Sequence, residues 1–295
     1  MSPGDHGWDV FSLDYHVDGP IGTVLSAAAM QRYLMLFNAL WKDKRMEMIL
    51  SDIWKEQAQT TKTCRRALPE LRVVLHGVQL LTTEMVHMVH QMQYYMTFEV
   101  LECSWHTLMD HLKSAQSLDD VIAAHDHFLS RIVSGALLDQ KSKAIRTHLR
   151  TFYNLIQNLK GLQERLSQAV SAELTARRSA EEAVQVRTQA KDFGTSADTE
   201  EAEKRRKKEF VSKVVPKLKS DLKICTQTYQ DMVQSFLLML SQHDDQNLHL
   251  LSTRLDFNEY YHRRDSRLNA RLTFHHKRKS MSHSNKASMQ NSICE

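Results

Sequence analysis

Glycine and proline are scarce over most of this chain, and this constrains its fold more than any other sequence feature. The 295 residues include eight Gly and four Pro, and half of each lie in the first 22 residues. The other 273 residues (295 minus 22) carry only four Gly and two Pro. Average sequences hold about 7% Gly and 5% Pro, and β-sandwiches, barrels and glycine-rich nucleotide folds depend on them for their turns. The sequence therefore predicts an all-α protein with long helices.

Apolar residues recur at helical spacing in several long segments. The pattern in residues 70–101 is apolar on several faces, which predicts a central helix buried by its neighbours. Ser117, with Asp120 three residues later, predicts a capped helix start. With 42% apolar residues the chain can bury a core, so we expect one large helical bundle. The predicted helices cover residues 20–57 with a break near 42–45, then 70–101, 117–133, 149–166 and 210–240.

Near the N-terminus the pattern changes to strict alternation. Apolar Phe11, Leu13 and Tyr15 alternate with polar residues, and Asp18-Gly19-Pro20 follows. A period of two predicts a short β-strand over residues 11–17. The alternative is an extended segment that packs on the helical bundle without pairing.

Charge divides the chain into a body and a tail. The net charge is +4, and residues 262–295 alone carry eight basic and two acidic residues, a net +6. The body is therefore close to neutral, which argues against nucleic-acid binding. We expect a folded domain over 1–262 and a disordered, basic, Ser-rich tail over 263–295. Lys277–Lys279 with Ser280 could bind an acidic surface or accept a phosphate.

Apolar density also falls between residues 170 and 209, where a charge run covers 200–208. One interpretation is a flexible charged insertion of about residues 170–209. The other, equally open, is the solvated face of a continuing helix.

The sequence shows no secretory signal and no apolar run long enough to span a membrane. The four cysteines, Cys64, Cys103, Cys225 and Cys294, form no CxxC pair, so we expect free thiols in a reducing compartment. These features predict a soluble, cytosolic protein without membrane association.

No P-loop, GxGxxG, GxSxG or HExxH motif occurs, so we assign no catalytic residue, cofactor or metal ligand. One enzymatic alternative is a di-metal carboxylate site in a helical bundle, built from two Glu-x-x-His motifs and further glutamates. Its residues would be Glu84, His87, Glu259 and His262, with Glu99 or Glu102. His125-Asp126-His127 is a weaker metal candidate, because no third or fourth ligand is identifiable.

Five polar residues interrupt the apolar helix around position 95, namely Gln91, Gln93, Tyr94, Tyr95 and Glu99. Buried polar groups need partners, so one interpretation is a hydrogen-bond network between helices that fixes their packing. The other is that this part of the helix lines a protein–protein surface.

A second polar and aromatic cluster lies near the end of the predicted domain. Tyr and Arg are frequent interface anchors, and this cluster is therefore a candidate binding surface. The alternative is a C-terminal segment packed onto the bundle. Its residues are Arg254, Asp256, Asn258, Tyr260 and Tyr261.

Three stretches together, residues 7–21, 85–105 and 254–261, resemble the gamma-tubulin complex proteins. The shorter stretches 45–47 and 122–125 fit the same resemblance, which covers about residues 4–262 in order. It implies the all-helical carboxy-terminal domain that binds gamma-tubulin. Full-length members also have an amino-terminal helical domain that makes most contacts with sibling subunits, and this chain begins inside the carboxy-terminal domain.

The resemblance implies a non-enzymatic scaffold that supports microtubule nucleation at microtubule-organising centres, that is, at the centrosome or spindle pole. Gamma-tubulin and sibling complex components are the implied partners, without nucleic acid or membrane. We expect the gamma-tubulin contact near Arg254, Asp256, Asn258, Tyr260 and Tyr261. A generic helical adaptor of another complex remains the third alternative.

Overall fold

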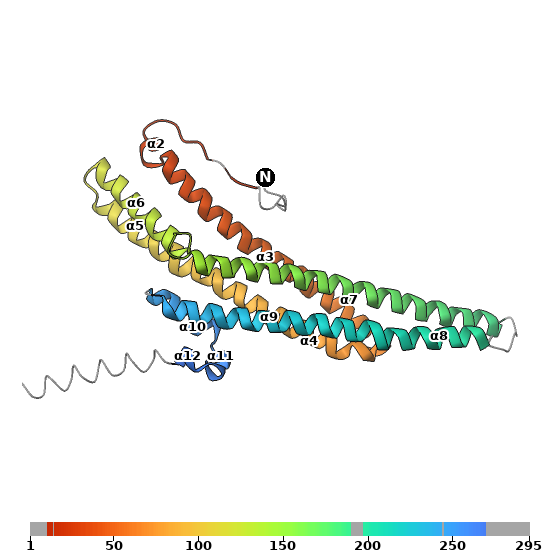
Figure 1. The fold of residues 1–295 in the computed structure, drawn as a ribbon. Coiled ribbons are helices and arrows are strands. Elements are labelled where there is room, and N and C mark those ends of the chain that lie inside the picture. The colour runs from red at the N-terminus through yellow and green to blue at the C-terminus, as the bar shows by residue number, and fades with distance from the viewer. Residues whose placement is uncertain (1–10, 14, 190–196, 244, 270–295) are drawn as a thin grey trace, which may run out of the picture. The chain divides into compact units, whose positions relative to one another are not determined.

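Helices account for most of the structure, a computed structural model that describes residues 11–13, 15–189, 197–243 and 245–269 (Figure 1). The chain divides into two units, Met1–Gln230 and Asp231–Glu295. The first unit contains α2 (Ile21–Val24), α3 (Ala27–Ala67), η1 (Pro69–Leu71), α4 (Arg72–Tyr94), η2 (Tyr95–Glu102), α5 (Cys103–Ser114), α6 (Leu118–Gly135), α7 (Lys143–Gln189), α8 (Ala197–Glu209), η3 (Phe210–Val214) and the start of α9 (Val215–Gln242). The end of α9, α10 (Gln246–Leu255), α11 (Tyr260–Arg264) and α12 (Ser266–Asn269) belong to the second.

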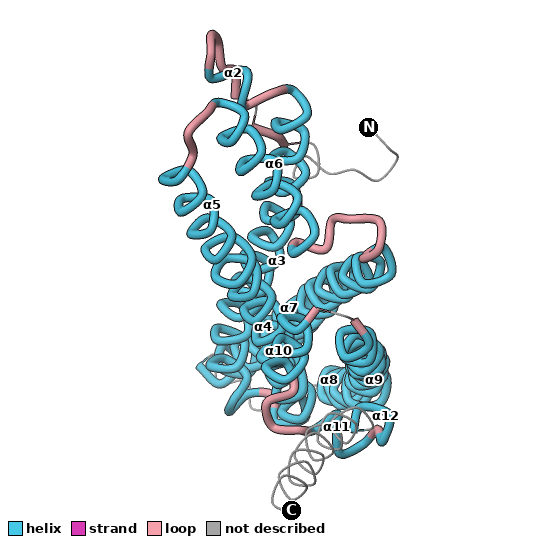
Figure 2. The backbone as a smooth tube through the Cα atoms, turned by 90° about the vertical axis from the view of Figure 1, so that its left-hand side faces the viewer, coloured by secondary structure: helices cyan, strands magenta, loops and turns pink. Residues whose placement is uncertain are grey.

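The all-α prediction is confirmed, but the predicted strand over 11–17 is wrong for the residues that the structure describes. Figure 2 shows only helices and loops in that part of the chain, and residues 11–13 and 15–17 are irregular. Phe11 instead packs against Trp41 of α3, with 5.1 Å between ring centroids. Leu13 and Tyr15 are largely exposed. Alternation alone did not produce a strand, because no described segment supplies a strand partner.

Helix α3 is longer than its apolar pattern predicted. Ser26 caps its N-terminus by accepting a hydrogen bond from the Ala29 N–H at 3.3 Å. The helix continues without a break to Ala67, so the predicted break near 42–45 and the predicted end at 57 are both wrong. At the predicted end the buried face includes the polar Gln57, whose Nε2 donates to Thr82 Oγ1 at 2.6 Å. A purely apolar pattern could not reveal this paired polar contact.

The run α4–η2–α5 contains the buried helix predicted over 70–101 and continues beyond it to Ser114. Its buried side chains include Met85, Met88 and Tyr95. Segment η2 is a π-helix, which is wider than an α-helix. π-Helices are rare in proteins, and those that occur are often found at functional sites. Gly135 at the end of α6 packs closely here, because a Cβ at that position would lie 2.9 Å from Val100 Cγ1.

Helix α6 begins as the sequence predicted. Ser117 Oγ accepts the Asp120 N–H at 3.2 Å, and Asp120 Oδ2 accepts the Ser117 N–H at 2.9 Å, which is a capping box. Backbone N–H groups of Gln116 and Ser117, with the Ser117 hydroxyl, lower the pKa of Asp120 below its usual value.

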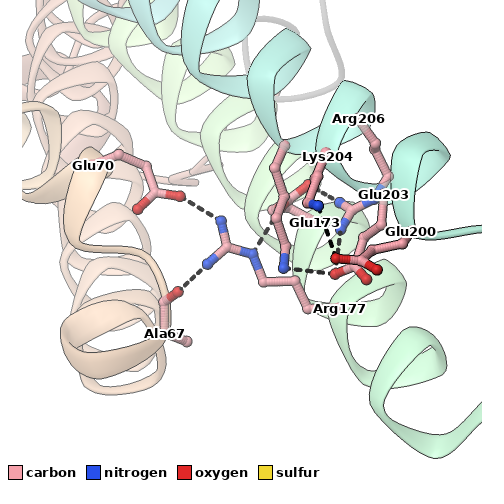
Figure 3. A network of polar contacts seen from close by, with 9 residues as sticks. Ala67, Glu70, Glu173, Arg177, Glu200, Glu203, Lys204 and Arg206 are labelled. Atoms are coloured by element: carbon pink, nitrogen blue, oxygen red, sulfur yellow. Dashed lines mark hydrogen bonds and ion pairs between the residues drawn. The ribbon is translucent and has the colours of Figure 1, made fainter. Parts of the chain in front are cut away.

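Residues 170–189 and 197–209 are helical, in α7 and α8, which agrees with the solvated-helix interpretation for these residues. Residues 190–196 lie outside the described part. The two helices are linked by an ion-pair cluster that we call the Glu173 clamp (Figure 3). Buried Glu173 accepts Arg177 Nε at 2.7 Å and also accepts Arg206 of α8.

Arg177 extends the Glu173 clamp to the end of α3. Its guanidinium donates to Ala67 O, the last carbonyl of α3, and to Glu70 in η1 (Figure 3). These acidic neighbours raise the pKa of Arg177 although partial burial opposes them. The clamp therefore joins α3, η1, α7 and α8 through charged side chains that are largely shielded from water.

Buried side chains of the second unit include Phe236, Leu240 and Leu251. Asp245 caps α10 by accepting the Asn247 N–H at 2.9 Å. The prediction of disorder from residue 263 is wrong for residues 263–269, because α11 and α12 extend to Asn269. Buried Asp265 accepts Gln234 Nε2 and Arg267 Nη2, each at 2.7 Å, and buried Leu268 anchors α12. The rest of the predicted tail, 270–295, lies outside the described residues.

Among the helices in the described ranges, none has both the length and the apolar character that a bilayer span requires.

Candidate partner-binding site

The C-terminal cluster includes a turn, residues 256–260, that connects α10 to α11 and ends at the first residue of α11. We call it the C-terminal turn. Its organising group is the buried carboxylate of Asp256, which accepts the N–H groups of Tyr261 at 3.1 Å and His262 at 2.9 Å. Asp256 Oδ2 also lies 2.6 Å from His262 Nδ1. Glu259 has a left-handed backbone with φ of 57°, which turns the chain into α11. Asp256 thus shapes the turn from inside rather than offering its carboxylate to a partner.

The C-terminal turn presents aromatic side chains on its outside. Phe257 is 72% exposed and Tyr260 is 41% exposed. The Arg264 guanidinium carbon lies 4.9 Å from the centroid of the Tyr260 ring, and Arg264 also donates to the Tyr260 hydroxyl. The Tyr261 ring meets Tyr260 edge to face, with 5.1 Å between centroids. These contacts restrict the exposed ring, which lowers the entropy cost of using it as an interface anchor.

The remaining members of this predicted cluster divide by exposure. Asn258 is exposed, and its Oδ1 accepts the Tyr260 N–H at 3.2 Å. Arg254 lies half-buried in the last turn of α10. The predicted site residues did not include Phe257, although it lies inside the same motif and is aromatic, which was a usable signal.

The polar segment around residue 95 also divides into inward and outward groups. Tyr95 is buried, and its hydroxyl donates to Gly135 O at 2.9 Å. Gln93 Nε2 donates to Glu47 Oε2 at 2.9 Å, which links α4 to α3. Gln91 and Glu99 are half-buried. Inward polar groups of this segment thus make hydrogen bonds between helices.

Tyr94 points outward and pairs with Phe98, with 4.7 Å between ring centroids and about half of each side chain exposed. The two rings border a groove of about 390 Å³, which we call the aromatic groove. It is lined by Leu40, Asp43, Lys44, His90, Gln93, Tyr94, Thr97, Phe98 and Leu101.

Beside the aromatic groove, Asp43 is buried and accepts a hydrogen bond from the Tyr153 hydroxyl of α7. Burial raises the pKa of Asp43 to about 6, although the Tyr153 hydrogen bond and the charge of Lys44 oppose this rise. Burial and the neighbouring carboxylate also raise the pKa of Tyr153 well above its usual value. No sequence motif pointed to this pair, because the two residues are 110 positions apart.

The residues of the di-metal alternative do not form such a site in the described chain, where no group of three or more His, Cys, Asp or Glu side chains could hold a metal ion. His262 is hydrogen-bonded to Asp256, and Glu84 is partly buried, which raises its pKa. In the His125 motif, the His125 ring bonds the Tyr33 hydroxyl at 2.9 Å and Asp126 accepts Arg32 at 2.7 Å. This motif therefore serves helix packing and a surface ion pair.

Comparison with known proteins adds an independent line of evidence. Residues 1–261 match the family model described as gamma tubulin complex component C-terminal. The chain is 48% identical over 268 residues to gamma-tubulin complex component 3 homolog of Xenopus laevis, covering 91% of this chain and 29% of the relative. It is 48% identical over 272 residues to gamma-tubulin complex component 3 of Homo sapiens, covering 92% and 30%. It is 29% identical over 268 residues to the spindle pole body component alp6 of Schizosaccharomyces pombe, covering 90% and 30%. The chain thus spans less than a third of the length of these relatives.

Proposed function

Because this chain belongs to the family of gamma-tubulin complex components, we propose that it is a non-enzymatic scaffold that binds gamma-tubulin and supports microtubule nucleation. Its place of action would be the microtubule-organising centre, at the centrosome or spindle pole. The names of its relatives, which are complex components and spindle pole body components, support this location. The work is positional, since holding several gamma-tubulin molecules in register raises their effective concentration for assembly.

We place the gamma-tubulin contact on the C-terminal turn, and one observation carries this assignment. Phe257 and Tyr260 are exposed on a turn that the buried Asp256 carboxylate fixes from within. Aromatic side chains that are exposed and already ordered lose little conformational entropy on binding, and such residues commonly dominate binding energy. Contacts with sibling components would lie mainly in the amino-terminal half that full-length members of the family have.

The test is capture of purified gamma-tubulin by the full 295-residue chain, followed by size-exclusion chromatography with light scattering. We expect a complex with the unchanged chain and at least about tenfold weaker binding after joint Phe257→Ala and Tyr260→Ala substitution, since one anchor commonly contributes more than about 1 kcal/mol. Circular dichroism checks that the variant remains helical.

The matched control replaces the exposed pair of the aromatic groove, Tyr94→Ala with Phe98→Ala. This variant removes two aromatic side chains of similar exposure from another surface. Unchanged binding of the control supports the C-terminal turn. Loss of binding in the control alone would move the contact to the aromatic groove and contradict our assignment.

A further inference from the structure

A dense run of basic residues follows α8, η3 and the start of α9, all within the first unit. Residues 204–223 contain nine basic and two acidic residues, a net charge of +7 over 20 positions. The three elements continue one another without a break, so at about 1.5 Å per residue the run is about 28 Å long. We call its exposed side the basic ridge.

Five of the nine basic residues form ion pairs with neighbouring carboxylates. Lys204 lies 2.7 Å from Glu200, and Lys207 lies 2.6 Å from Glu203. Lys213 similarly pairs with Glu209 at 2.7 Å. On α9, Asp221 is bound by Arg165 of α7 at 3.3 Å, so it does not offset the lysines beside it.

Four lysines of the basic ridge have no such partner: Lys208, Lys217, Lys219 and Lys223 make no ion pair with any other described residue. All four are exposed. Between these exposed positions, Phe210, Val215, Leu218 and Leu222 of the same helices are buried and pack into the unit. The unpaired charge therefore lies on the solvent side and is available to a partner.

The ridge is also held in place before any partner binds. Arg206, in the middle of the α8 charge run, turns inward and donates to buried Glu173 (Figure 3). Leu222 packs against α4, where a Cβ at Gly77 would lie 2.7 Å from Leu222 Cδ2. Because α8 and α9 are docked at both positions, the lysines project from a fixed helical support, which limits the entropy cost of binding to the lysine side chains themselves.

We propose that the basic ridge binds an acidic, extended peptide segment of a partner protein. At about 3.5 Å per extended residue, about eight residues would match the length of the ridge. Lysine ammonium groups are mobile, strongly hydrated point charges that pair with carboxylates without demanding one geometry. Binding is therefore reversible and sensitive to salt, since exposed pairs contribute little each and are screened beyond a Debye length.

Two other anionic partners fit less well. Single-stranded nucleic acids stack their bases on exposed aromatic rings, and Phe210, the only aromatic residue in positions 204–223, is buried. Helices that bind membrane surfaces have many large apolar residues on one face. Along this helical run the exposed large apolar residues are two, Val211 and Ile224. An acidic peptide needs neither feature. The inference does not rest on gamma-tubulin binding, which we assign to other residues.

The test uses the full chain and a fluorescein-labelled glutamate peptide of about ten residues, with binding followed by anisotropy at low salt. The ridge variant carries Lys208→Gln, Lys217→Gln, Lys219→Gln and Lys223→Gln. The control variant carries Lys55→Gln, Lys113→Gln, Lys141→Gln and Lys143→Gln, which removes the same charge from exposed sites elsewhere in the first unit. Circular dichroism establishes that both variants are as helical as the unchanged chain.

We expect the ridge variant to bind the glutamate peptide about tenfold more weakly than the control variant, from four pairs of about 0.4 kcal/mol each. Absence of binding by the unchanged chain, or equal weakening in both variants, overturns the proposal. Oligo-dT and phosphatidylserine vesicles are measured in parallel. If the unchanged chain binds either probe more tightly than the peptide, and the ridge variant loses that binding, the acidic-peptide proposal is overturned in favour of that partner. Capture of gamma-tubulin by the ridge variant is measured separately, so failure of one proposal does not imply failure of the other.

Discussion

The polar segment 91–102 and the C-terminal segment 254–265 carry similar residues but use them differently. Each has a buried polar group that bonds the backbone, Tyr95 in the first and Asp256 in the second. Each also has a pair of exposed rings, Tyr94 with Phe98 and Phe257 with Tyr260. In the first, a continuous helix holds the rings, whereas in the second a turn of a few residues does so.

This difference decides how each segment responds to mutation. In a helix, many backbone hydrogen bonds and buried neighbours share the stabilisation, so one lost contact has a limited effect. In the C-terminal turn a single carboxylate supports the geometry, and α11 has only five residues. We therefore expect the turn to be sensitive at one position and the helical segment to be tolerant.

The largest effect is expected for Asp256→Ala. It removes an acceptor from two backbone N–H groups and from His262 in a buried site. We expect a loss of about 4 kcal/mol in the local free energy of opening, which frees α11. Hydrogen exchange of residues 256–269 measures it. Asp256→Asn, which keeps one acceptor oxygen, should lose less, and equal protection in Asp256→Ala would show that the turn does not depend on this carboxylate.

A change in pH should alter the stability of the two units in opposite directions. Burial raises the folded pKa of Asp43 to about 6, above its usual 3.8, so between these values the folded state binds more protons than the unfolded state. Stability of the first unit therefore falls by about 3 kcal/mol as pH rises from about 4 to 6. Urea unfolding followed by tryptophan fluorescence reports this unit, since all four Trp lie before residue 106.

Two variants check this comparison. Asp43→Asn should remove the fall in stability between pH 4 and 6, and an unchanged slope would contradict the assignment. In the second unit, Arg267 and Gln234 lower the pKa of Asp265, so its contribution is present at neutral pH and is lost as pH falls. Asp265→Asn should therefore act mainly at neutral pH, as measured by hydrogen exchange of residues 260–269.

Close packing predicts a smaller effect at the π-helix. Gly135→Ala places a methyl group against both Cγ atoms of Val100. The short, branched valine side chain has little freedom to move out of the way. We expect a loss of about 2 kcal/mol from overpacking, measured by urea unfolding. Adding Val100→Ala makes room and should recover part of the loss. No recovery would mean that the cost arises from the backbone rather than from this contact.

The smallest effect is expected for loss of one hydroxyl. Tyr95→Phe removes the hydrogen bond to Gly135 O inside the core and should cost about 1 kcal/mol. Tyr94→Phe, one residue earlier and exposed, is the matched control and should change stability by no more than a few tenths. Equal effects at the two positions would contradict the division into inward and outward groups.

Several local features were predictable because they depend on neighbouring residues. The capping box of Ser117 and Asp120 and the buried helix near residues 70–101 follow from short-range spacing. The C-terminal end of α3 and the structure of residues 263–269 were predicted wrongly. In each segment a buried polar residue, Gln57 or Asp265, continues the packed face. A prediction based on apolar spacing alone does not detect such residues.

The sequence by itself determined the helical class, through its scarcity of Gly and Pro, and the family, through the order of its motifs. Only the tertiary structure decided which polar residues are structural and which are exposed. Asp43 meets Tyr153 and Glu173 meets Arg206 across long stretches of chain. Such pairs form because a buried charge or hydroxyl must find a partner wherever the fold brings one close, and spacing along the chain carries no information about that distance.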